Sequence, residues 1–183
     1  GEKEESIYDV DFVTLNPYMR IDAIKPFIED CKKYDKGAFI LVKTSNPSSG
    51  DLQDLKLENG EEVYTKVVKL VEEWGEELRG KYGYSSISAV VGATYPKQLQ
   101  DLRKIAPHTF FLIPGYGAQG GKADDIALGF DENGIGGIVN SSRGLMCAYK
   151  SDLWKDKYTE EEFEKATRAE AIRTRDELNE YIK

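Results

Sequence analysis

Two polar, glycine-containing runs late in the chain have the residue types of an anion site. The first reads Pro-Gly-Tyr-Gly-Ala-Gln-Gly-Gly at 114–121, and the second reads Asn-Ser-Ser-Arg-Gly at 140–144. Glycines let backbone N–H groups approach an anion closely, and Gln119 adds side-chain donors. Arg143 supplies a permanent cation whose planar fork suits two phosphate oxygens. The runs predict a phosphate site, although tight turns and a surface arginine are the alternative interpretation.

The first run also matches the dinucleotide fingerprint G-x-G-x-x-G, through Gly115, Gly117 and Gly120. That fingerprint follows the first strand of a βαβ unit, with an acid about 20 residues further on at the end of the next strand. Here it follows the fourth predicted strand, and the next strand ends in Asn-Ser-Ser. The context argues against dinucleotide binding.

The run Thr44-Ser45-Asn46 before Pro47 has two interpretations. Its hydroxyl and amide groups suit a turn, and they also suit the reading of a polar ligand edge.

The remaining candidates for chemistry are weaker. The single histidine, His108, precedes a predicted strand and so lies away from the loops at the strand ends, where we expect a surface or capping residue. Cys31 and Cys147 have no histidine nearby in sequence. The pair Asp124-Asp125 could bind a metal, but it better fits the first turn of a short helix. We therefore predict no metal site.

The elements that position these runs alternate along the chain. Amphipathic helices are predicted between short, β-branched or aromatic runs that read as buried strands. This alternation predicts βα units and a parallel sheet. Five units are few for a (β/α)8 barrel, so counting alone favours a doubly wound sheet. The expected strands are 12–15, 38–42, 87–91, 109–113 and 135–139, and the expected helices are 22–34, 61–82, 96–105 and 159–182.

Length and composition narrow the classes of function. A chain of 183 residues suits one domain. Its 25 Lys and Arg against 33 Asp and Glu give a net charge of −8, which argues against nucleic acid as a partner. No apolar run reaches the roughly 18 residues that a membrane span needs. Two cysteines are too few for a disulfide framework, so a reducing cytoplasm is the expected compartment.

The loops, in this order, resemble those of the orotidine 5′-phosphate decarboxylase family, specifically its longer-chain bacterial branch. Five stretches between residue 11 and about residue 150 carry the resemblance, and their order and spacing together are specific. They are Val-Thr-Leu-Asn-Pro-Tyr (13–18), Leu-Val-Lys-Thr-Ser-Asn-Pro (41–47), Val-Gly-Ala-Thr (91–94), Pro-Gly-Tyr-Gly-Ala-Gln-Gly-Gly (114–121) and Val-Asn-Ser-Ser-Arg-Gly (139–144).

The resemblance implies a cofactor-free carboxy-lyase that converts orotidine 5′-phosphate to UMP and CO2, the last step of UMP synthesis. It implies a (β/α)8 barrel that dimerises with active sites at the subunit interface, of which residues 1–183 hold the fourth to eighth βα units as one part-domain. Arg143 and Gln119 match the family's phosphate-binding side chains, and Ser45 matches the hydroxyl that reads the pyrimidine. Gly115 and Gly144 match backbone positions near the ligand. Thr44 and Asn46, on either side of Ser45, are expected to bind the pyrimidine with it.

The family's catalytic signature, an Asp-x-Lys-x-x-Asp run after the third strand, is missing from this sequence. The nearest run, at 54–59, ends in Asn59 and better fits a turn before a helix. We therefore expect the catalytic lysine and aspartates on an N-terminal segment that accompanies this chain. A non-catalytic nucleotide-binding barrel remnant is the main alternative. A sugar-phosphate isomerase or aldolase barrel is a third, but it would need a convincing catalytic lysine or acid on the strands present.

Overall fold

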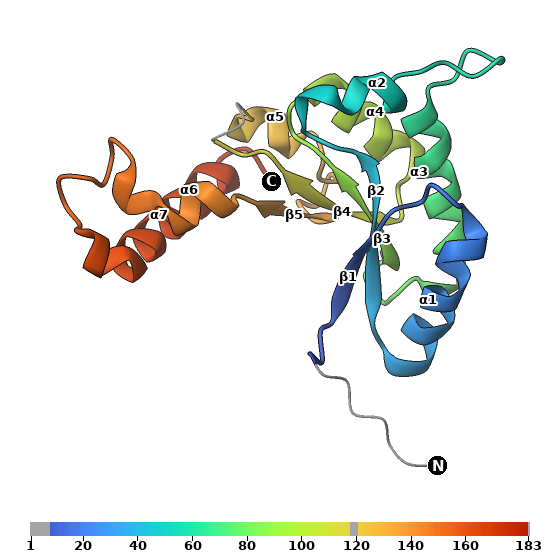
Figure 1. Cartoon of the computed structure of the whole chain (residues 1–183), viewed down its shortest axis with the longest axis horizontal. Coiled ribbons are helices and arrows are strands. Elements are labelled where there is room, and N and C mark those ends of the chain that lie inside the picture. Colours follow the sequence, from blue (N-terminus) through green and yellow to red (C-terminus); the bar gives the residue numbers. More distant parts are fainter. Residues whose placement is uncertain (1–7, 118–120, 183) are drawn as a thin grey trace.

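The computed structural model describes residues 8–117 and 121–182, which form one five-stranded parallel sheet (Figure 1). The strands lie side by side in chain order. A doubly wound sheet needs a point where this order reverses, whereas successive units of a barrel follow one another around the ring. The doubly wound sheet that the count of five βα units favours is therefore wrong, and the part-barrel that the resemblance implies is confirmed. The strands are β1 (Phe12–Leu15), β2 (Gly37–Lys43), β3 (Ser85–Val91), β4 (Thr109–Pro114) and β5 (Gly137–Asn140).

The helices follow the strands and supply one side of the core. They are α1 (Ile21–Tyr34), α2 (Gly50–Gln53), α3 (Val63–Trp74), α4 (Pro96–Ile105), α5 (Ala123–Ala127), α6 (Ser142–Met146) and α7 (Phe163–Asn179), with 3-10 turns at Pro47–Ser49, Glu76–Leu78, Ala148–Lys150 and Glu160–Glu162.

The core lies between the helices and one face of the sheet. Alternate residues of β2, such as Ile40 and Val42, are buried there together with Val68 of α3 and Leu102 of α4. Alternation is expected because successive side chains of a strand point to opposite faces. No described helix is long and apolar enough to cross a membrane.

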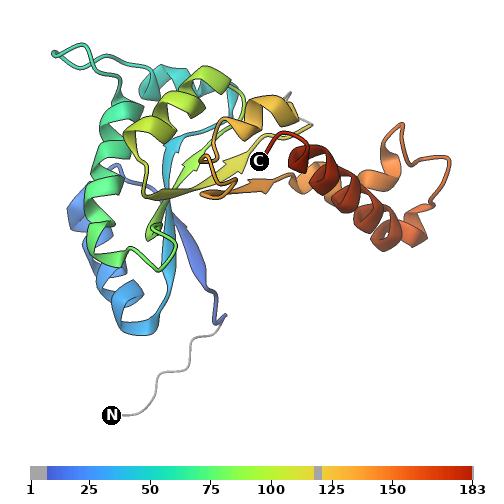
Figure 2. The ribbon, with the colours of Figure 1, turned by 180° about the vertical axis from the view of Figure 1, so that it is seen from behind.

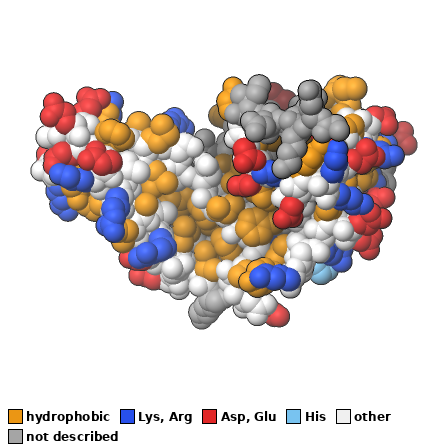
Figure 3. Space-filling view, turned by 90° about the horizontal axis from the view of Figure 1, so that it is seen from below, with side chains coloured by type: hydrophobic (Ala, Val, Ile, Leu, Met, Phe, Trp, Pro, Cys, Tyr) orange, Lys and Arg blue, Asp and Glu red, His pale blue; other side chains and the backbone are white. Residues whose placement is uncertain are grey.

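The other face of the sheet is apolar but largely uncovered. Phe12 and Ile138, on the two edge strands, are 42% and 52% exposed. Phe12 stacks on Phe39 with ring centroids 4.8 Å apart. With Phe110 and Leu112, they line a hollow of about 770 Å³, and Figure 3 shows a hollowed apolar surface. This is the face that a closed barrel turns inward.

Several elements differ from their predicted bounds, among them the last helix, which spans Phe163–Asn179 and not 159–182. The helix expected over 61–82 begins at Val63 and ends at Trp74, and the chain continues as the 3-10 turn Glu76–Leu78. Gly75 between them packs closely against β3, since a Cβ there would lie 2.5 Å from the Ser85 hydroxyl, which donates to the Gly75 carbonyl. The last strand begins at Gly137 and not at residue 135. Gly136 has φ of 98°, which is outside strand geometry.

The C-terminal elements project away from the sheet, as Figures 1 and 2 show for α6, α7 and the connection between them. Trp154 in this connection donates its indole N–H to Glu170 of α7 at 2.8 Å. Glu170 also accepts from Arg173, and Arg173 pairs with Glu177 at 2.5 Å. Through Glu177 the helix reaches Tyr116, whose hydroxyl donates to its carboxylate. The projecting elements are thus tied to the loop after β4.

Candidate functional site

The loops after β2, β3 and β4 meet at the carboxyl edge of the sheet. The Gly92 amide donates to the Lys43 carbonyl at 2.7 Å, and the Ala93 amide donates to the Pro114 carbonyl at 2.9 Å. Pro114 in turn is paired in register with Asn140 at the end of β5. The candidate loops that the sequence places far apart are therefore neighbours at one edge, where parallel α/β proteins bind their ligands.

The loops after β4 and β5 enclose a small hollow of about 80 Å³. The φ angles of Gly115 and Gly117 are 109° and 70°, a region that side chains disfavour. Gly121 closes the base of the first loop by donating to the Gly115 carbonyl at 3.1 Å. Gln119 lies outside the described residues. The lining residues are Pro114, Gly115, Tyr116, Asn140, Ser141, Ser142, Arg143 and Gly144.

Arg143 stands at this hollow as an exposed cation on α6. Within residues 8–117 and 121–182 it forms no ion pair, so its guanidinium is available to an anion. The Ser141 hydroxyl donates to the Tyr116 carbonyl at 3.2 Å and so links the two loops. A Cβ at Gly144 would lie 2.5 Å from that hydroxyl, which explains the glycine there. The predicted residues Arg143, Gly115 and Gly144 are thus brought together.

Ser45 lies where the loop after β2 touches the loop after β3. An ideal Cβ on Gly92 would be 3.0 Å from the Ser45 Cβ and 3.1 Å from its amide nitrogen. The absence of a side chain at Gly92 therefore lets Ser45 approach the strand end closely.

Thr44 and Asn46, predicted beside Ser45 as pyrimidine-binding residues, make hydrogen bonds within their own loop. The Thr44 hydroxyl donates to the Asn46 side-chain oxygen at 2.6 Å, and the Asn46 amide donates to Ser48 at 3.1 Å. Both side chains shape the turn. Their contact with a pyrimidine stays a prediction.

Lys43 and Asp54 form a charged contact that sequence reasoning missed. Lys43 is completely buried, and its ammonium donates to Asp54 at 2.7 Å. The sequence signal was a lysine ending a run of strand residues, but its partner lies eleven residues away, across a turn. The run at 54–59, the nearest one to the Asp-x-Lys-x-x-Asp signature, therefore does not form a catalytic group: Asp54 pairs with Lys43, and Lys56 is exposed.

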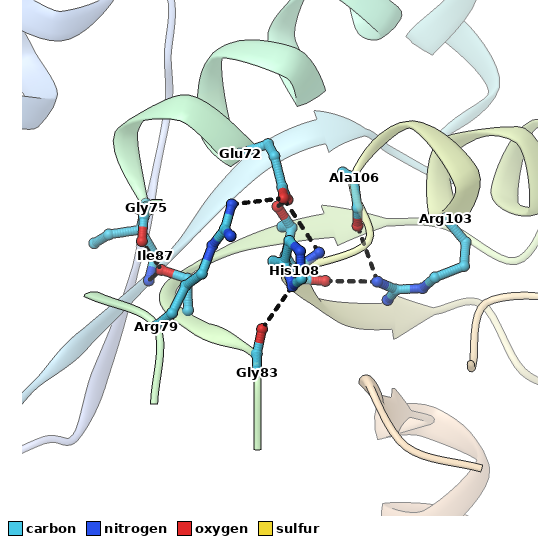
Figure 4. A network of polar contacts seen from close by, with 10 residues as sticks. Glu72, Gly75, Arg79, Gly83, Ile87, Arg103, Ala106 and His108 are labelled. Carbon is cyan, nitrogen blue, oxygen red and sulfur yellow. Dashed lines mark hydrogen bonds and ion pairs between the residues drawn. The ribbon is translucent and has the colours of Figure 1, made fainter. Parts of the chain in front are cut away.

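The opposite end of the sheet holds a polar network around His108 (Figure 4). The His108 amide donates to Glu72 at 3.2 Å, and its ring Nδ1 lies 3.0 Å from the Gly83 carbonyl. Arg103 nearby donates to the carbonyls of Ala106 and Thr109, among others. His108 thus lies just before β4, away from the loops at the strand ends as expected, and its ring contacts the turn at Gly83.

The acidic pair and the two cysteines do not take part in a cluster of metal ligands within the described residues. Asp124 and Asp125 lie in the first turn of α5, as predicted. Cys31 and Cys147 are both free, and burial raises the pKa of the Cys31 thiol. In the part of the chain that the structure describes, no three His, Cys, Asp or Glu side chains gather as metal ligands.

Comparison with known proteins gives one consistent family. The family model described as Orotidine 5′-phosphate decarboxylase / HUMPS family matches residues 3–151. The orotidine 5′-phosphate decarboxylase of Caldicellulosiruptor bescii is 44% identical over 98% of this chain and 57% of its own length. That of Clostridium tetani is 45% identical over 97% of this chain and 60% of its own length. The chain thus spans little more than half the length of these curated relatives.

Solved structures agree with this family in fold. Leishmania donovani UMP synthase matches with a TM-score of 0.69 and 32% identity, over 94% of this chain and 33% of that one. Leishmania donovani OMP decarboxylase matches with a TM-score of 0.67 and 29% identity, over 93% of this chain and 58% of that one.

Proposed function

The chain belongs to the orotidine 5′-phosphate decarboxylase / HUMPS family, and we propose that it is the phosphate- and pyrimidine-binding part of an orotidine 5′-phosphate decarboxylase. One observation carries the proposal. Arg143, the glycine loop after β4 and Ser45 stand on loops that meet at one edge of the sheet. Among the described residues Arg143 has no ion-pair partner. A nucleoside monophosphate presents a dianion and a polar base edge to such a set of groups.

In the proposed complex the two ends of the ligand are held by different loops. The Arg143 fork and the backbone N–H groups around Gly115 hold the 5′-phosphate, together with Gln119 and Gly144. Charge-assisted, bidentate contacts of this kind are among the strongest hydrogen bonds in proteins. Ser45, with Thr44 and Asn46 beside it, reads the amide edge of the pyrimidine. The ring is thereby oriented by groups that need no metal or organic cofactor.

The decarboxylation step is assigned to residues outside this sequence. Loss of CO2 leaves a carbanion on the ring, which a lysine ammonium stabilises and protonates while a neighbouring carboxylate crowds the departing one. We place that lysine and its aspartates on an N-terminal segment that completes the barrel. The relatives' greater length and the uncovered inner face of the sheet support this placement. Without that segment we expect the chain to bind nucleotide but not to decarboxylate it.

The proposed assembly is a homodimer with shared active sites, as the family resemblance implies.

The unpaired cysteines Cys31 and Cys147 support a reducing, cytoplasmic setting.

The test is the substitution Arg143→Ala. Loss of a charge-assisted fork is expected to weaken UMP binding by about 2–4 kcal/mol and to leave the binding of uridine, which has no phosphate, nearly unchanged. Isothermal titration calorimetry with both ligands measures this difference. Arg168→Ala, at another exposed arginine on α7, is the matched control and is expected to change neither affinity. Equal losses for UMP and uridine in Arg143→Ala would contradict the phosphate role.

A further inference from the structure

Lys43 is a buried charge for which the proposed function has no use. Its side chain is 1% exposed, and its ammonium donates to Asp54 at 2.7 Å and to the Ser49 hydroxyl at 3.4 Å. A buried ammonium is costly unless it is paired and hydrogen-bonded, and replacing such a pair by apolar groups is often neutral or stabilising. Stability alone is therefore a weak reason for a lysine here.

Two aromatic rings complete the pocket around the Lys43 ammonium. It lies 4.8 Å from the ring centroid of Tyr95 and 5.6 Å from that of Tyr64, within the range of cation–π attraction. Tyr64 belongs to α3 and Tyr95 immediately precedes α4. Lys43 thus connects the end of β2 to the first turn of α3, to the residue before α4 and to the residue that follows α2.

Gln53 and Thr44, the chain neighbours of Asp54 and Lys43, form a second contact between the same two segments. Gln53, next to Asp54, accepts from the Thr44 amide at 3.0 Å and donates to the Thr44 hydroxyl at 2.8 Å. Residues 53 and 54 therefore hold residues 43 and 44 through three hydrogen bonds. Ser45 follows directly, and on its other side it lies against Gly92.

We propose that Lys43 and Asp54 are positioning residues that fix the Ser45 hydroxyl for pyrimidine recognition. The inference rests on the proposed function, because it assigns the pair to the base-reading half of that site. Lys43 itself does not contact the ligand, since its ammonium is enclosed by Asp54, Ser49 and the two rings. Its effect is on selectivity for the base and not on the grip of the phosphate.

The test is Lys43→Met, read out with UMP and with ribose 5-phosphate, which lacks the base. Methionine replaces the lysine with an unbranched apolar side chain only one atom shorter, and the Asp54 left behind is 38% exposed and can be solvated. We therefore expect the free energy of unfolding to stay the same or rise, while UMP affinity falls about tenfold, the equivalent of one neutral hydrogen bond. Affinity for ribose 5-phosphate is expected to stay within about twofold of wild type.

Two further variants separate positioning from general damage. Lys56→Met removes an exposed lysine of the same loop and is expected to change neither affinity. Asp54→Asn leaves the buried ammonium without its anion, so we expect the same base-selective loss together with lower stability.

Two results with Lys43→Met overturn the inference: UMP affinity equal to wild type, or equal losses for UMP and ribose 5-phosphate. A wild-type chain that binds neither ligand overturns the proposed function, and the inference with it.

Discussion

The missing side chain at Gly92 determines how closely Ser45 can approach the edge of the sheet. The ideal Cβ of an alanine at position 92 would lie 3.0 Å from the Ser45 Cβ. Gly92→Ala is therefore expected to push Ser45 away by a few tenths of an ångström. Small overpacking of this kind costs about 1–3 kcal/mol in well-packed sites.

The expected result of Gly92→Ala is a fall of about tenfold in UMP affinity, corresponding to about 1.4 kcal/mol, with ribose 5-phosphate affinity unchanged. Calorimetric titration of both ligands checks it. Gly80→Ala is the control, because its Cβ would meet only the Tyr84 carbonyl at an ordinary 3.6 Å. Unchanged UMP binding in Gly92→Ala would show that Ser45 does not read the base.

Single residues of the site were predictable from sequence where their chemistry is local. Arg143 and the glycines near it are visible as residue types in short runs. The charged contact of Lys43 could not be predicted, because it depends on Asp54, Tyr64 and Tyr95, which only the folded chain brings together. The hydrogen bonds of Thr44 were missed for the same reason, since Gln53 lies nine residues away.

At the scale of elements, Arg103 anchors α4 to the loops at the amino end of the sheet. Its guanidinium donates to the carbonyls of Gly129, Ala106, Thr109 and Gly136 at 2.7–3.0 Å. Burial lowers the pKa of Arg103 to about 10, which leaves it charged at neutral pH. One side chain thus satisfies four backbone oxygens, two between the end of α4 and the start of β4 and two in the connection from α5 to β5.

Arg103→Met is expected to lower the free energy of unfolding by about 3 kcal/mol, because buried carbonyls lose charged donors. Urea denaturation measures the change. The control is Arg79→Met, which removes a partly exposed ion pair with Glu72 and is expected to cost under about 1 kcal/mol. Equal effects of the two substitutions would contradict the anchoring role.

The contact between α7 and the connection before it depends on the charge of Glu170. Hydrogen bonds from Arg173, aided by the Trp154 indole, hold the pKa of Glu170 below its ordinary value. A carboxyl with a lowered pKa in the folded state adds stability above its unfolded pKa, and this stability is lost as the pH falls through the folded pKa. The contact is therefore expected to weaken only in acid.

Glu170→Gln tests this dependence by removing the charge. We expect a loss of about 1 kcal/mol at neutral pH, and a difference from wild type that shrinks as the pH falls below about 4. Urea denaturation at stepped pH values gives both curves. Glu164→Gln, an exposed position on the same helix, is the control. Parallel curves for wild type and Glu170→Gln would show that the charge does not matter.

Elements were predicted well where the pattern is local and less well at their ends. All five strands were expected within a few residues of where they lie. The long helix was extended past Trp74 because Glu76, Glu77 and Leu78 continue its amphipathic pattern. In the structure these residues form a 3-10 turn, and Gly75 before them packs against Ser85 of β3, a contact across ten residues that periodicity does not record.

At the scale of the whole molecule, the described sheet has two open edges and an apolar inner face. Phe12 on β1 and Ile138 on β5 are both substantially exposed. Such edges pair readily with other strands, and proteins normally cover them. The further βα units that we propose would close the ring between β5 and β1 and fill the hollow beneath them.

The order of the strands is the feature that counting could not predict. A βα unit has the same local pattern in a doubly wound sheet and in a barrel, so five units fit both. The two folds differ in strand order: a barrel adds each new strand next to the previous one, whereas a doubly wound sheet reverses direction once. Strand order belongs to the whole sheet and not to a single unit. The resemblance of the loops indicated the barrel, and the order β1 to β5 confirms it.

The mass of the intact native particle, isolated from its source, tests the central claim most directly. We expect a particle that carries the Asp-x-Lys-x-x-Asp run, either on a second polypeptide bound to this chain or on one longer chain that contains it. Native and denaturing mass spectra of the same sample distinguish these two forms. A single species of 20.6 kDa would contradict the proposed decarboxylase, because the catalytic residues would then be absent from the particle.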